Sequence, residues 1–211
     1  MLVLALDTAT PTLVAGVARW ADGRADVLAE HALPSGTRHA ELLTGAVTGV
    51  LAEAGLRVAD LGAVVTGLGP GPFTGLRVGV VTAAAIGDAR GLPVVGVCSL
   101  DAVGAGARAV VTDARRKEVY WAVYGGDGGR LDGPGVARPE ELTVPRPVVG
   151  DPRFADRLGV DVTPADVTTA GLLRAAGPQL ADPSSAGPLV PLYLRRPDAV
   201  PPASYKPVTS A

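Results

Sequence analysis

The stretch GLGPGPFTGLRVG, residues Gly67–Gly79, must turn the chain sharply and then begin a helix. It contains five glycines and two prolines, and it follows the apolar run GAVVT. A glycine-rich turn between a strand and a helix often holds phosphate. This stretch lacks both nucleotide fingerprints, since Thr74 stands where GxGxxG needs glycine and Leu76 where a Walker loop needs lysine. The stretch therefore predicts a tight turn, with Thr74 as the N-cap of the following helix.

Apolar runs and turn signals on either side of this stretch predict the other elements of the first half of the chain. The pair Asp22–Gly23 is typical of a hairpin turn, and Gly55 and Gly91 are typical of residues that end helices. We expect strands at Leu2–Asp7, Thr12–Trp20, Ala25–Leu33, Gly62–Leu68 and Leu92–Ser99, and helices at about Arg38–Ala54 and Gly75–Arg90.

A second unit is expected from Arg108 onward. The segment RAVVTDARRKEVYWAVYGGDGG indicates a strand, a turn and a second strand, and GGDGG ends the hairpin. Beyond Leu131 the expected elements are short: PVVG, a helical PRFADRL, a helix near Thr168–Leu180, and LVPLYLRR. The element order β-β-β-α-β-α-β is followed by a shorter, incomplete version of the same order. This repetition predicts an α/β protein of two related lobes. We assign residues 1–104 to a first lobe that carries dimerisation helices, 105–196 to a reduced second lobe, and 197–211 to a disordered tail.

The composition excludes several classes of function. The formal net charge is −2 and the pI is near 5.7, so we expect no basic surface able to grip RNA unaided. One cysteine and two histidines, without CxxC or HxxxH, leave no disulfide and almost no ligands for zinc. The first ten residues lack the basic start of a signal peptide, and the longest apolar segment, Val78–Ile86, is too short to cross a bilayer. We expect a soluble cytoplasmic protein.

Both predicted helices have an unusual distribution of side chains. In the first, apolar residues span about half the circumference, wider than the ~100° stripe that one core requires. Either a second surface is covered, or the helix lies deep in its own lobe. In the second, Gly75, Gly79, Ala83 and Gly87 recur every four residues. Since an interior glycine costs roughly 1 kcal/mol, this face indicates close approach to another helix or sheet. We predict a subunit interface at His39, Leu42, Leu43, Ala46, Val50, Gly75, Arg77, Gly79, Ala83, Ile86 and Gly87.

The polar residues of the turns each allow two interpretations. In LDTAT, Asp7 and Thr8 either hold a phosphate and a metal-bound water or satisfy backbone groups of the turn. Arg77 is either solvated or paired with Glu41 or an anionic ligand, and His39 is favoured as structural or interfacial. The candidates for cofactor binding are Asp7, Thr8, Gly69, Gly71 and Thr74.

A basic turn, Arg115–Lys117, follows Asp113 in the second unit. A solvated turn is the default interpretation of such a run, because charged side chains usually face water. A contribution to an RNA-binding surface is the alternative.

Five segments stand in the order and approximate spacing of the TsaB (YeaZ) family: LALDTAT, RHAELL, GLGPGPFTGLRVG, DARRKEVYWAVY and PLYLRRPDA. The resemblance covers nearly the whole chain and is strongest through residue 124. It implies an actin/Hsp70/sugar-kinase-like α/β fold with two duplicated lobes, each holding a mixed sheet and helices. It also implies a part in making threonylcarbamoyladenosine beside the anticodon of tRNAs that read ANN codons.

Within that family, the resemblance implies a non-catalytic scaffold and dimerisation subunit. A related subunit, TsaD, holds a metal and transfers the threonylcarbamoyl group, and TsaE is an ATPase of the same complex. The chain would pair with a TsaD-like subunit, or form a homodimer when alone, through its first-lobe helices. It would meet tRNA only through the complex and no membrane, and it would bind no metal or cofactor independently. Any ATP or ADP would lie at the complex interface.

Departures from the pattern of TsaD favour this assignment. The segment VCSLDAVGAG has no histidine where TsaD has a pair, and the second-lobe turn TDARRKE lacks the glycines of TsaD's phosphate turn. One alternative is a nucleotide-dependent phosphotransferase or ATPase of the same fold that uses Asp7 and the glycine loop, and the missing glycine turn argues against it. The other is a peptidase, against which the lack of a nucleophile elbow, a Cys–His pairing and a zinc motif argues.

Overall fold

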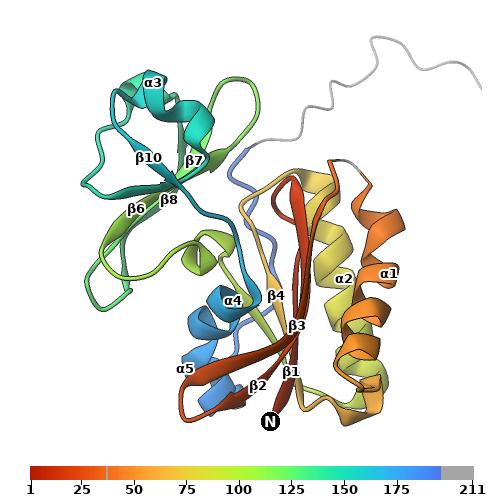
Figure 1. Ribbon diagram of the computed structural model, residues 1–211. Coiled ribbons are helices and arrows are strands. Elements are labelled where there is room, and N and C mark those ends of the chain that lie inside the picture. The colour runs from red at the N-terminus through yellow and green to blue at the C-terminus, as the bar shows by residue number, and fades with distance from the viewer. Residues whose placement is uncertain (37, 196–211) are drawn as a thin grey trace, which may run out of the picture.

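The computed structural model describes residues 1–36 and 38–195, which form two lobes, each around a five-stranded sheet (Figure 1). In the first sheet the strand order is β3-β2-β1-β4-β5. β2 pairs antiparallel with β1 and β3, whereas β1, β4 and β5 run parallel. The strands are β1 Leu2–Asp7, β2 Thr12–Ala21, β3 Arg24–Pro34, β4 Ala63–Gly67 and β5 Val94–Val97. All five predicted strands of this lobe are confirmed, the fifth being shorter than expected.

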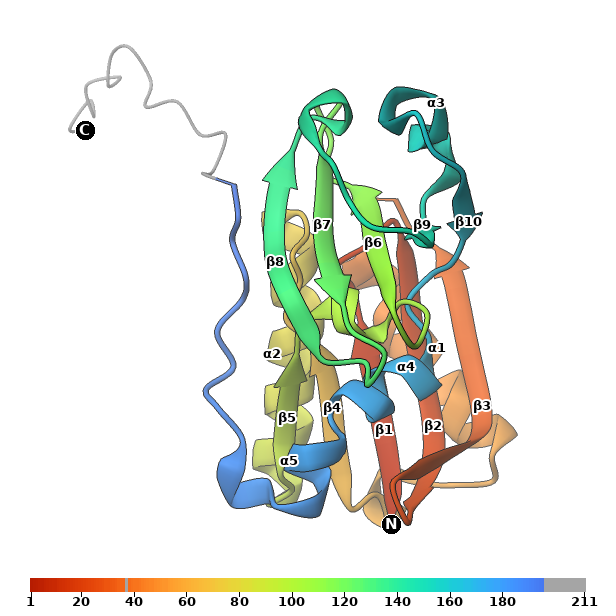
Figure 2. The ribbon, with the colours of Figure 1, turned by 90° about the vertical axis from the view of Figure 1, so that its left-hand side faces the viewer.

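The second sheet repeats the arrangement of the first, with the strand order β10-β9-β6-β7-β8 (Figure 2). Its strands are β6 Arg108–Asp113, β7 Val119–Tyr124, β8 Arg130–Ala137, β9 Val148–Gly150 and β10 Val162–Pro164. Here too, two antiparallel pairings are followed by two parallel ones. The predicted duplication of a mixed sheet is therefore confirmed. β8 was not expected, because Gly133, Pro134 and Gly135 interrupt its pattern; it lies at the sheet edge, where proline is tolerated.

The helices are unevenly divided between the two lobes. The α-helices are α1 His39–Glu53, α2 Phe73–Arg90, α3 Ala155–Leu158, α4 Thr169–Ala175 and α5 Gly177–Ala181. Single 3-10 turns lie at Val58–Asp60, Ser99–Ala102 (η2), Pro139–Glu141, Pro152–Phe154 and Pro183–Ser185. The crossovers of the second lobe contain only short turns and α3, which accounts for its reduced length. The helix expected near Thr168–Leu180 is two helices, because Pro178 lies in the first turn of the second one.

Helix α2 begins two residues earlier than expected. Its N-cap is Pro72, and no side chain caps the helix. The prediction that Thr74 is the N-cap is wrong, because Pro72 already has the extended backbone of a cap and leaves Phe73 as the first helical residue. The left-handed residue Gly91 ends the helix, as predicted.

Helices cover both faces of the first sheet (Figure 1). Alternate residues of β1 point to opposite faces, so Leu4 and Leu6 pack beneath α1 and α2 with residues such as Leu43 and Ala83. Val3 and Ala5 pack on the other face, among residues of α4 and α5. The apolar side of α1 is therefore covered by its own lobe, whereas residues such as Glu41, Thr44 and Gly45 are exposed.

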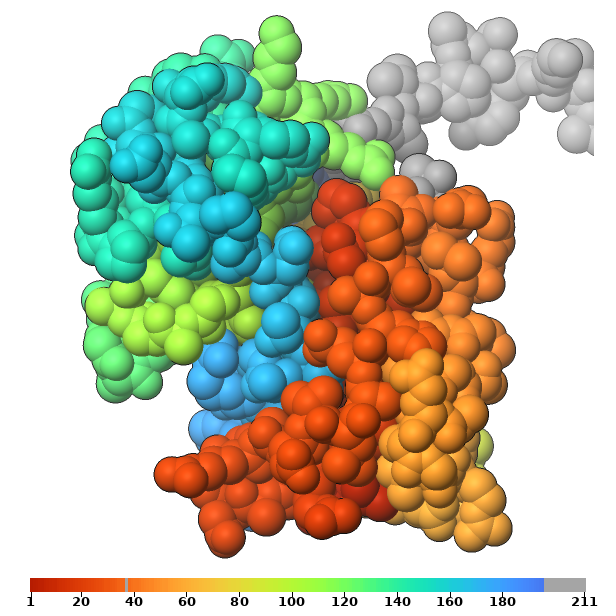
Figure 3. All heavy atoms as spheres, in the orientation of Figure 1, coloured from red at the N-terminus to blue at the C-terminus, as the bar shows by residue number. Residues whose placement is uncertain are grey.

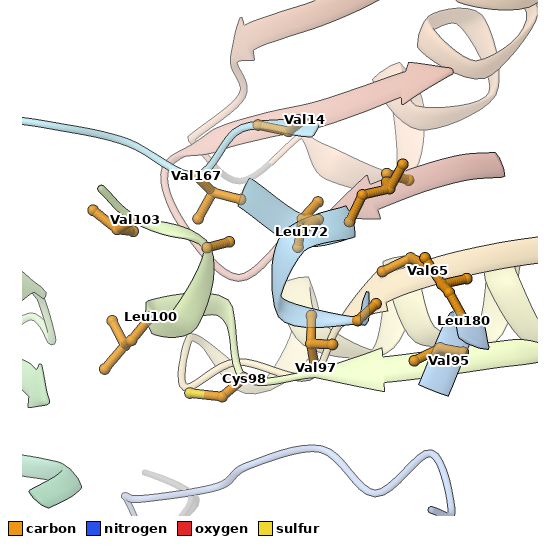
Figure 4. Packing of buried hydrophobic residues seen from close by; sticks show 14 of the residues in the cluster. Val14, Val65, Val95, Val97, Cys98, Leu100, Val103, Val167, Leu172 and Leu180 are labelled. Carbon is orange, nitrogen blue, oxygen red and sulfur yellow. The ribbon is translucent and has the colours of Figure 1, made fainter. Parts of the chain in front are cut away.

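One hydrophobic core runs through both lobes. Leu172 and Leu180 of α4 and α5 meet Val14, Val65 and Val97 of the first sheet (Figure 4). The same cluster continues through Leu100 and Val103 and takes in Val110, Tyr120, Ala122 and Tyr124 of the second sheet. A smaller core fills the opposite face of the second sheet, around Val111 and Phe154. The lobes are thus joined by continuous packing.

The lobe boundaries predicted from the sequence assign α4 and α5 to the second lobe, residues 105–196. In the structure these helices lie on the first sheet, in the blue segment between the two lobes in Figure 3. The predicted tail, residues 197–211, lies outside the described residues. Within residues 1–36 and 38–195, no helix is both long and apolar enough to span a membrane.

Candidate functional site

The glycine-rich loop packs against the turn between β1 and β2. The Thr8 hydroxyl donates to the carbonyl of Gly75 at 2.7 Å and accepts from the N–H of Gly79 at 3.0 Å. A methyl group at Gly79 would lie 2.6 Å from Thr8 Oγ1, one at Gly75 would lie 2.8 Å from the carbonyl oxygen of Thr8, and one at Gly71 would overlap the carbonyl of Ala9. Close approach of two backbones therefore explains why glycine occupies these positions.

Asp7 lies at the centre of this junction and is fully buried. Its carboxylate accepts from the N–H of Ala9 at 2.8 Å and from the hydroxyl of Ser99. The Ser99 hydroxyl in turn accepts from the N–H of Gly69 at 3.1 Å. Burial raises the pKa of Asp7 above its usual value, although the Ser99 hydroxyl and the Ala9 N–H favour the charged form.

The candidates for cofactor binding are only partly brought together. Asp7, Thr8, Gly69 and Gly71 meet in this junction, whereas Thr74 is exposed on the outside of α2. Both oxygens of Asp7 and the hydroxyl of Thr8 are engaged within the chain, which supports their interpretation as turn-stabilising groups. Their use as ligand groups stays a prediction. Across the described residues, no three or more His, Cys, Asp or Glu side chains are grouped so as to hold a metal ion.

The small-residue face of α2 contacts the β1–β2 turn and β5 of the same chain. A methyl group at Gly87 would overlap Val94 of β5, and His39 is hydrogen-bonded at 2.9 Å to the carbonyl of Thr10. The close approach that the small residues predict is thus made within the chain, to Thr8 and Val94, and a role of these residues in a subunit interface stays a prediction. The predicted interface residues that are buried in this way are His39, Leu43, Ala46, Val50, Gly75, Gly79, Ala83 and Gly87.

The opposite side of α2 is exposed and partly apolar. Phe73, Arg77 and Val81 recur every four residues and are all exposed, Val81 to 63%. The Arg77 guanidinium lies 3.8 Å from the centre of the Phe73 ring, and its Nε donates to the hydroxyl of Tyr193 at 3.0 Å. The Phe73 and Tyr193 rings are 4.9 Å apart. We call these four residues the α2 outer face; Arg77 thus meets two aromatic rings rather than Glu41.

Two predicted interface residues, Leu42 and Ile86, are half-buried against the core beneath α1 and α2. Sequence reasoning missed Phe73, Val81 and Tyr193. The i, i+4, i+8 spacing of Phe73, Arg77 and Val81 was a visible signal. Tyr193 gave none, since it comes from a segment more than one hundred residues away in the chain.

A polar cluster fixes the junction between the lobes. The Asp101 carboxylate accepts from the Tyr124 hydroxyl at 2.8 Å and from two nitrogens of Arg130 at 3.0 and 3.1 Å. The Arg108 guanidinium stacks 4.0 Å from the Tyr124 ring centre, and Arg174 of α4 donates to the carbonyl of Gly104 at 2.6 Å. Burial raises the pKa of Tyr124 far above its ordinary range, so its hydroxyl stays protonated. The cluster ties η2, β7, β8 and α4 together.

Known proteins resemble this chain over most of its length. Residues 31–179 match the family described as TsaD: tRNA N6-adenosine threonylcarbamoyltransferase. An uncharacterized protein of Mycobacterium tuberculosis is 51% identical over 206 residues, which is 94% of each chain. The tRNA threonylcarbamoyladenosine biosynthesis protein TsaB of Escherichia coli is 35% identical over 132 residues, 59% of this chain and 55% of that one. The solved structure of YeaZ from Pseudomonas aeruginosa has a TM-score of 0.76 and 28% identity, with 92% of this chain and 99% of that chain covered.

The duplicated mixed sheets define a two-lobed α/β protein of the actin/Hsp70/sugar-kinase-like fold. The chain belongs to the TsaD-like family and, within it, to the TsaB (YeaZ) group.

Proposed function

We propose that this chain is a non-catalytic subunit of the assembly that adds threonylcarbamoyl to the adenosine beside the anticodon of tRNAs reading ANN codons. Its relatives in Escherichia coli and Bacillus subtilis are named tRNA threonylcarbamoyladenosine biosynthesis protein TsaB. In this proposal the chain supports a TsaD-like catalytic subunit, and a TsaE-like ATPase joins the same assembly.

One observation carries the non-catalytic part of the proposal. The loop that would hold phosphate in a kinase of this fold is filled by the chain's own groups: Thr8 is bonded to Gly75 and Gly79, and Asp7 to Ala9 and Ser99. A phosphate would need these N–H donors and this space, which the chain's own groups already occupy. The opposing turn of the second lobe has no glycine. The same facts argue against an independent phosphotransferase or ATPase.

The α2 outer face is the proposed contact surface for the catalytic subunit, and for a second copy when the chain is alone. Exposed aromatic and aliphatic side chains gathered on one helix are typical of protein interfaces. Phe73, Tyr193 and Val81 are 40%, 39% and 63% exposed. Arg77 lies over the Phe73 ring and bonds to the Tyr193 hydroxyl, so it contacts both aromatic residues and offers a charge for a partner carboxylate. ATP or ADP, where it takes part, would bind at this shared interface.

The test combines reconstitution with a surface variant. Purified TsaD-like and TsaE-like subunits should modify a tRNA transcript only when this chain is present, and the chain alone should give no product. Val81→Glu should weaken pairing with the TsaD-like subunit by about 30-fold, which corresponds to the loss of about 2 kcal/mol expected at one of the few hot-spot residues of an interface. Val27→Glu, on the exposed edge strand β3, is the matched control and should pair normally. Product from the chain alone, or normal pairing of a folded Val81→Glu variant, would contradict the proposal.

A further inference from the structure

The last described segment of the chain links the first lobe to the second. Residues 186–195, which we call the strap, follow the turn at Pro183–Ser185 with irregular backbone, and Figure 2 shows them within the blue segment that runs upward alongside α2. The N–H of Leu192 donates to the carbonyl of Leu68 at 2.7 Å, which fixes the strap on the first lobe. Because irregular backbone is not fixed by a ladder of hydrogen bonds, individual contacts decide where the strap lies.

Arg195 fastens the end of the strap to the second lobe. Its guanidinium donates to the carbonyl of Ala114 at 2.7 Å and pairs with the Glu118 carboxylate at 3.0 Å. Both acceptors belong to the turn between β6 and β7, and the side chains of Arg195 and Glu118 are only 23% and 30% exposed. The two contacts use different nitrogens of one planar group, so they fix the direction of the strap as well as its distance from the turn.

Tyr193, two residues before this anchor, is the contribution of the strap to the α2 outer face. Its ring lies 4.9 Å from the Phe73 ring, and its hydroxyl accepts from Nε of Arg77 at 3.0 Å. Leu192 and Leu194, on either side of it, pack against the core that joins the lobes. The strap therefore places Tyr193 on α2 while its neighbouring leucines face the interior.

This arrangement ties the α2 outer face to the second lobe. Phe73, Arg77 and Val81 share one helix, which fixes their spacing, whereas Tyr193 is 116 residues from Arg77 along the chain. Each interface side chain that must be ordered during association lowers the affinity, and a side chain held in place beforehand avoids that cost. The anchor at Arg195 gives Tyr193 such support.

We propose that Arg195 is a positioning residue for the α2 outer face: it anchors the strap to the β6–β7 turn and so holds Tyr193 where a partner meets it. The role of that face in pairing with the TsaD-like subunit rests on the proposed function. The affinity of this pairing then depends on an ion pair with the second lobe, although the pairing surface is on the first. The competing explanation is that Arg195 contacts the partner directly.

The first measurement uses the full chain alone and does not require the proposed function. Phe73 and Phe154 are the two phenylalanines of the chain, so labelling with para-fluorophenylalanine gives two fluorine NMR resonances. Arg195→Ala should shift the Phe73 resonance toward its position in Tyr193→Ala, and Phe154, buried in the smaller core, should serve as the internal reference. Arg57→Ala, which breaks an exposed ion pair with Asp60 in the first lobe, is the matched control and should leave the Phe73 resonance unmoved.

The second measurement is the affinity of each variant for the purified TsaD-like subunit. Arg195→Ala should weaken pairing by about 3- to 10-fold, the range expected when one interface side chain is no longer held before binding. Glu118→Ala removes one acceptor of the anchor and keeps Arg195, and it should weaken pairing in the same direction. In a Tyr193→Ala background, Arg195→Ala should change the affinity by less than about 2-fold, because no side chain remains for it to position.

Three results would overturn the proposal, each in variants that circular dichroism shows to be folded. An unmoved Phe73 resonance in Arg195→Ala would show that the anchor does not position the strap. Unchanged pairing of Glu118→Ala, or equal losses from Arg195→Ala with and without Tyr193, would make Arg195 a direct partner contact. Failure of the proposed function is a different result: the unaltered chain would not pair with the TsaD-like subunit, while the Phe73 resonance would still respond to Arg195→Ala.

Discussion

Substituting Gly79 with alanine should destabilise the protein, although alanine is the better helix former by about 1 kcal/mol. The added methyl would lie 2.6 Å from Thr8 Oγ1, well inside van der Waals contact. Thr8 is buried, so its hydroxyl must move and lose its bonds to Gly75 and Gly79, which contribute about 1 kcal/mol each at most. Overpacking of a filled core costs typically 1–3 kcal/mol. After the gain in helix propensity, we expect a net loss of about 1 to 3 kcal/mol. Leucine at this position would be far worse, so Gly79→Leu tests folding and not subunit pairing.

The assay is urea unfolding monitored by circular dichroism. The midpoints are compared between variants whose unfolding free energy has the same dependence on urea concentration. Gly45→Ala is the matched control, because Gly45 is an exposed residue of α1 and an added methyl would meet nothing within 4 Å. That variant should be about 0.5 to 1 kcal/mol more stable than the unaltered chain.

A double-mutant cycle identifies the cause. Thr8→Ala alone should cost about 1 to 2 kcal/mol, because it removes a hydroxyl with two partners. With that hydroxyl gone, the atom nearest the new methyl is Thr8 Cβ at 3.5 Å, an ordinary contact, so Gly79→Ala should then be nearly neutral. The coupling energy should exceed about 1 kcal/mol. Additive single effects, or a Gly79→Ala variant as stable as the unaltered chain, would refute the packing of α2 against the β1–β2 turn.

Two further predictions concern buried ionisable groups. Burial raises the pKa of Asp7 above 3.8, so the unfolded chain releases this proton at a lower pH than the native chain does. The free energy of unfolding therefore falls as pH rises from the unfolded pKa to the native pKa of Asp7. Urea midpoints should therefore show that Asp7→Asn, which keeps an acceptor for the Ala9 N–H, gains stability over the unaltered chain as pH rises from 4; a difference independent of pH would contradict this reasoning. Burial also raises the pKa of the Cys98 thiol to about 12. At pH 8 the thiolate fraction of Cys98 is then on the order of 10⁻⁴. A disulfide reagent should therefore label no thiol in the native protein and one thiol in the protein unfolded in urea. Rapid labelling of the native protein would contradict the burial of Cys98.

The elements that could be predicted are those whose signal is local. β1, β2 and β3 were visible as apolar runs bounded by turn residues, and α1 as an apolar period of 3.6 residues. β8 was not, because its position in the sheet depends on pairing with β7, and its glycines and proline resemble a loop. The start of α2 was misplaced because Thr74 is a better capping residue than Pro72 by type, while the backbone of Pro72 fixed the helix start.

The candidate site was predictable in position but not in orientation. The repeat of Gly75, Gly79, Ala83 and Gly87 correctly indicated close backbone approach, yet periodicity defines a helix face without saying what lies opposite it. In the structure, Thr8 of the β1–β2 turn and Val94 of β5 lie opposite Gly79 and Gly87. The cluster around Asp101 could not be predicted at all, since its members come from positions as distant as Tyr124, Arg130 and Arg174.

The position of α4 has a consequence for how this protein is made. The strands of the first lobe leave the ribosome early, but the face of β1 that carries Val3 and Ala5 is covered by α4 and α5, which are synthesised near the end of the chain. Until residues 169–181 emerge, one side of the first sheet has no cover of its own. The nascent first lobe therefore exposes an apolar sheet face until α4 and α5 have been synthesised. This exposure favours association with chaperones or with other unfinished chains.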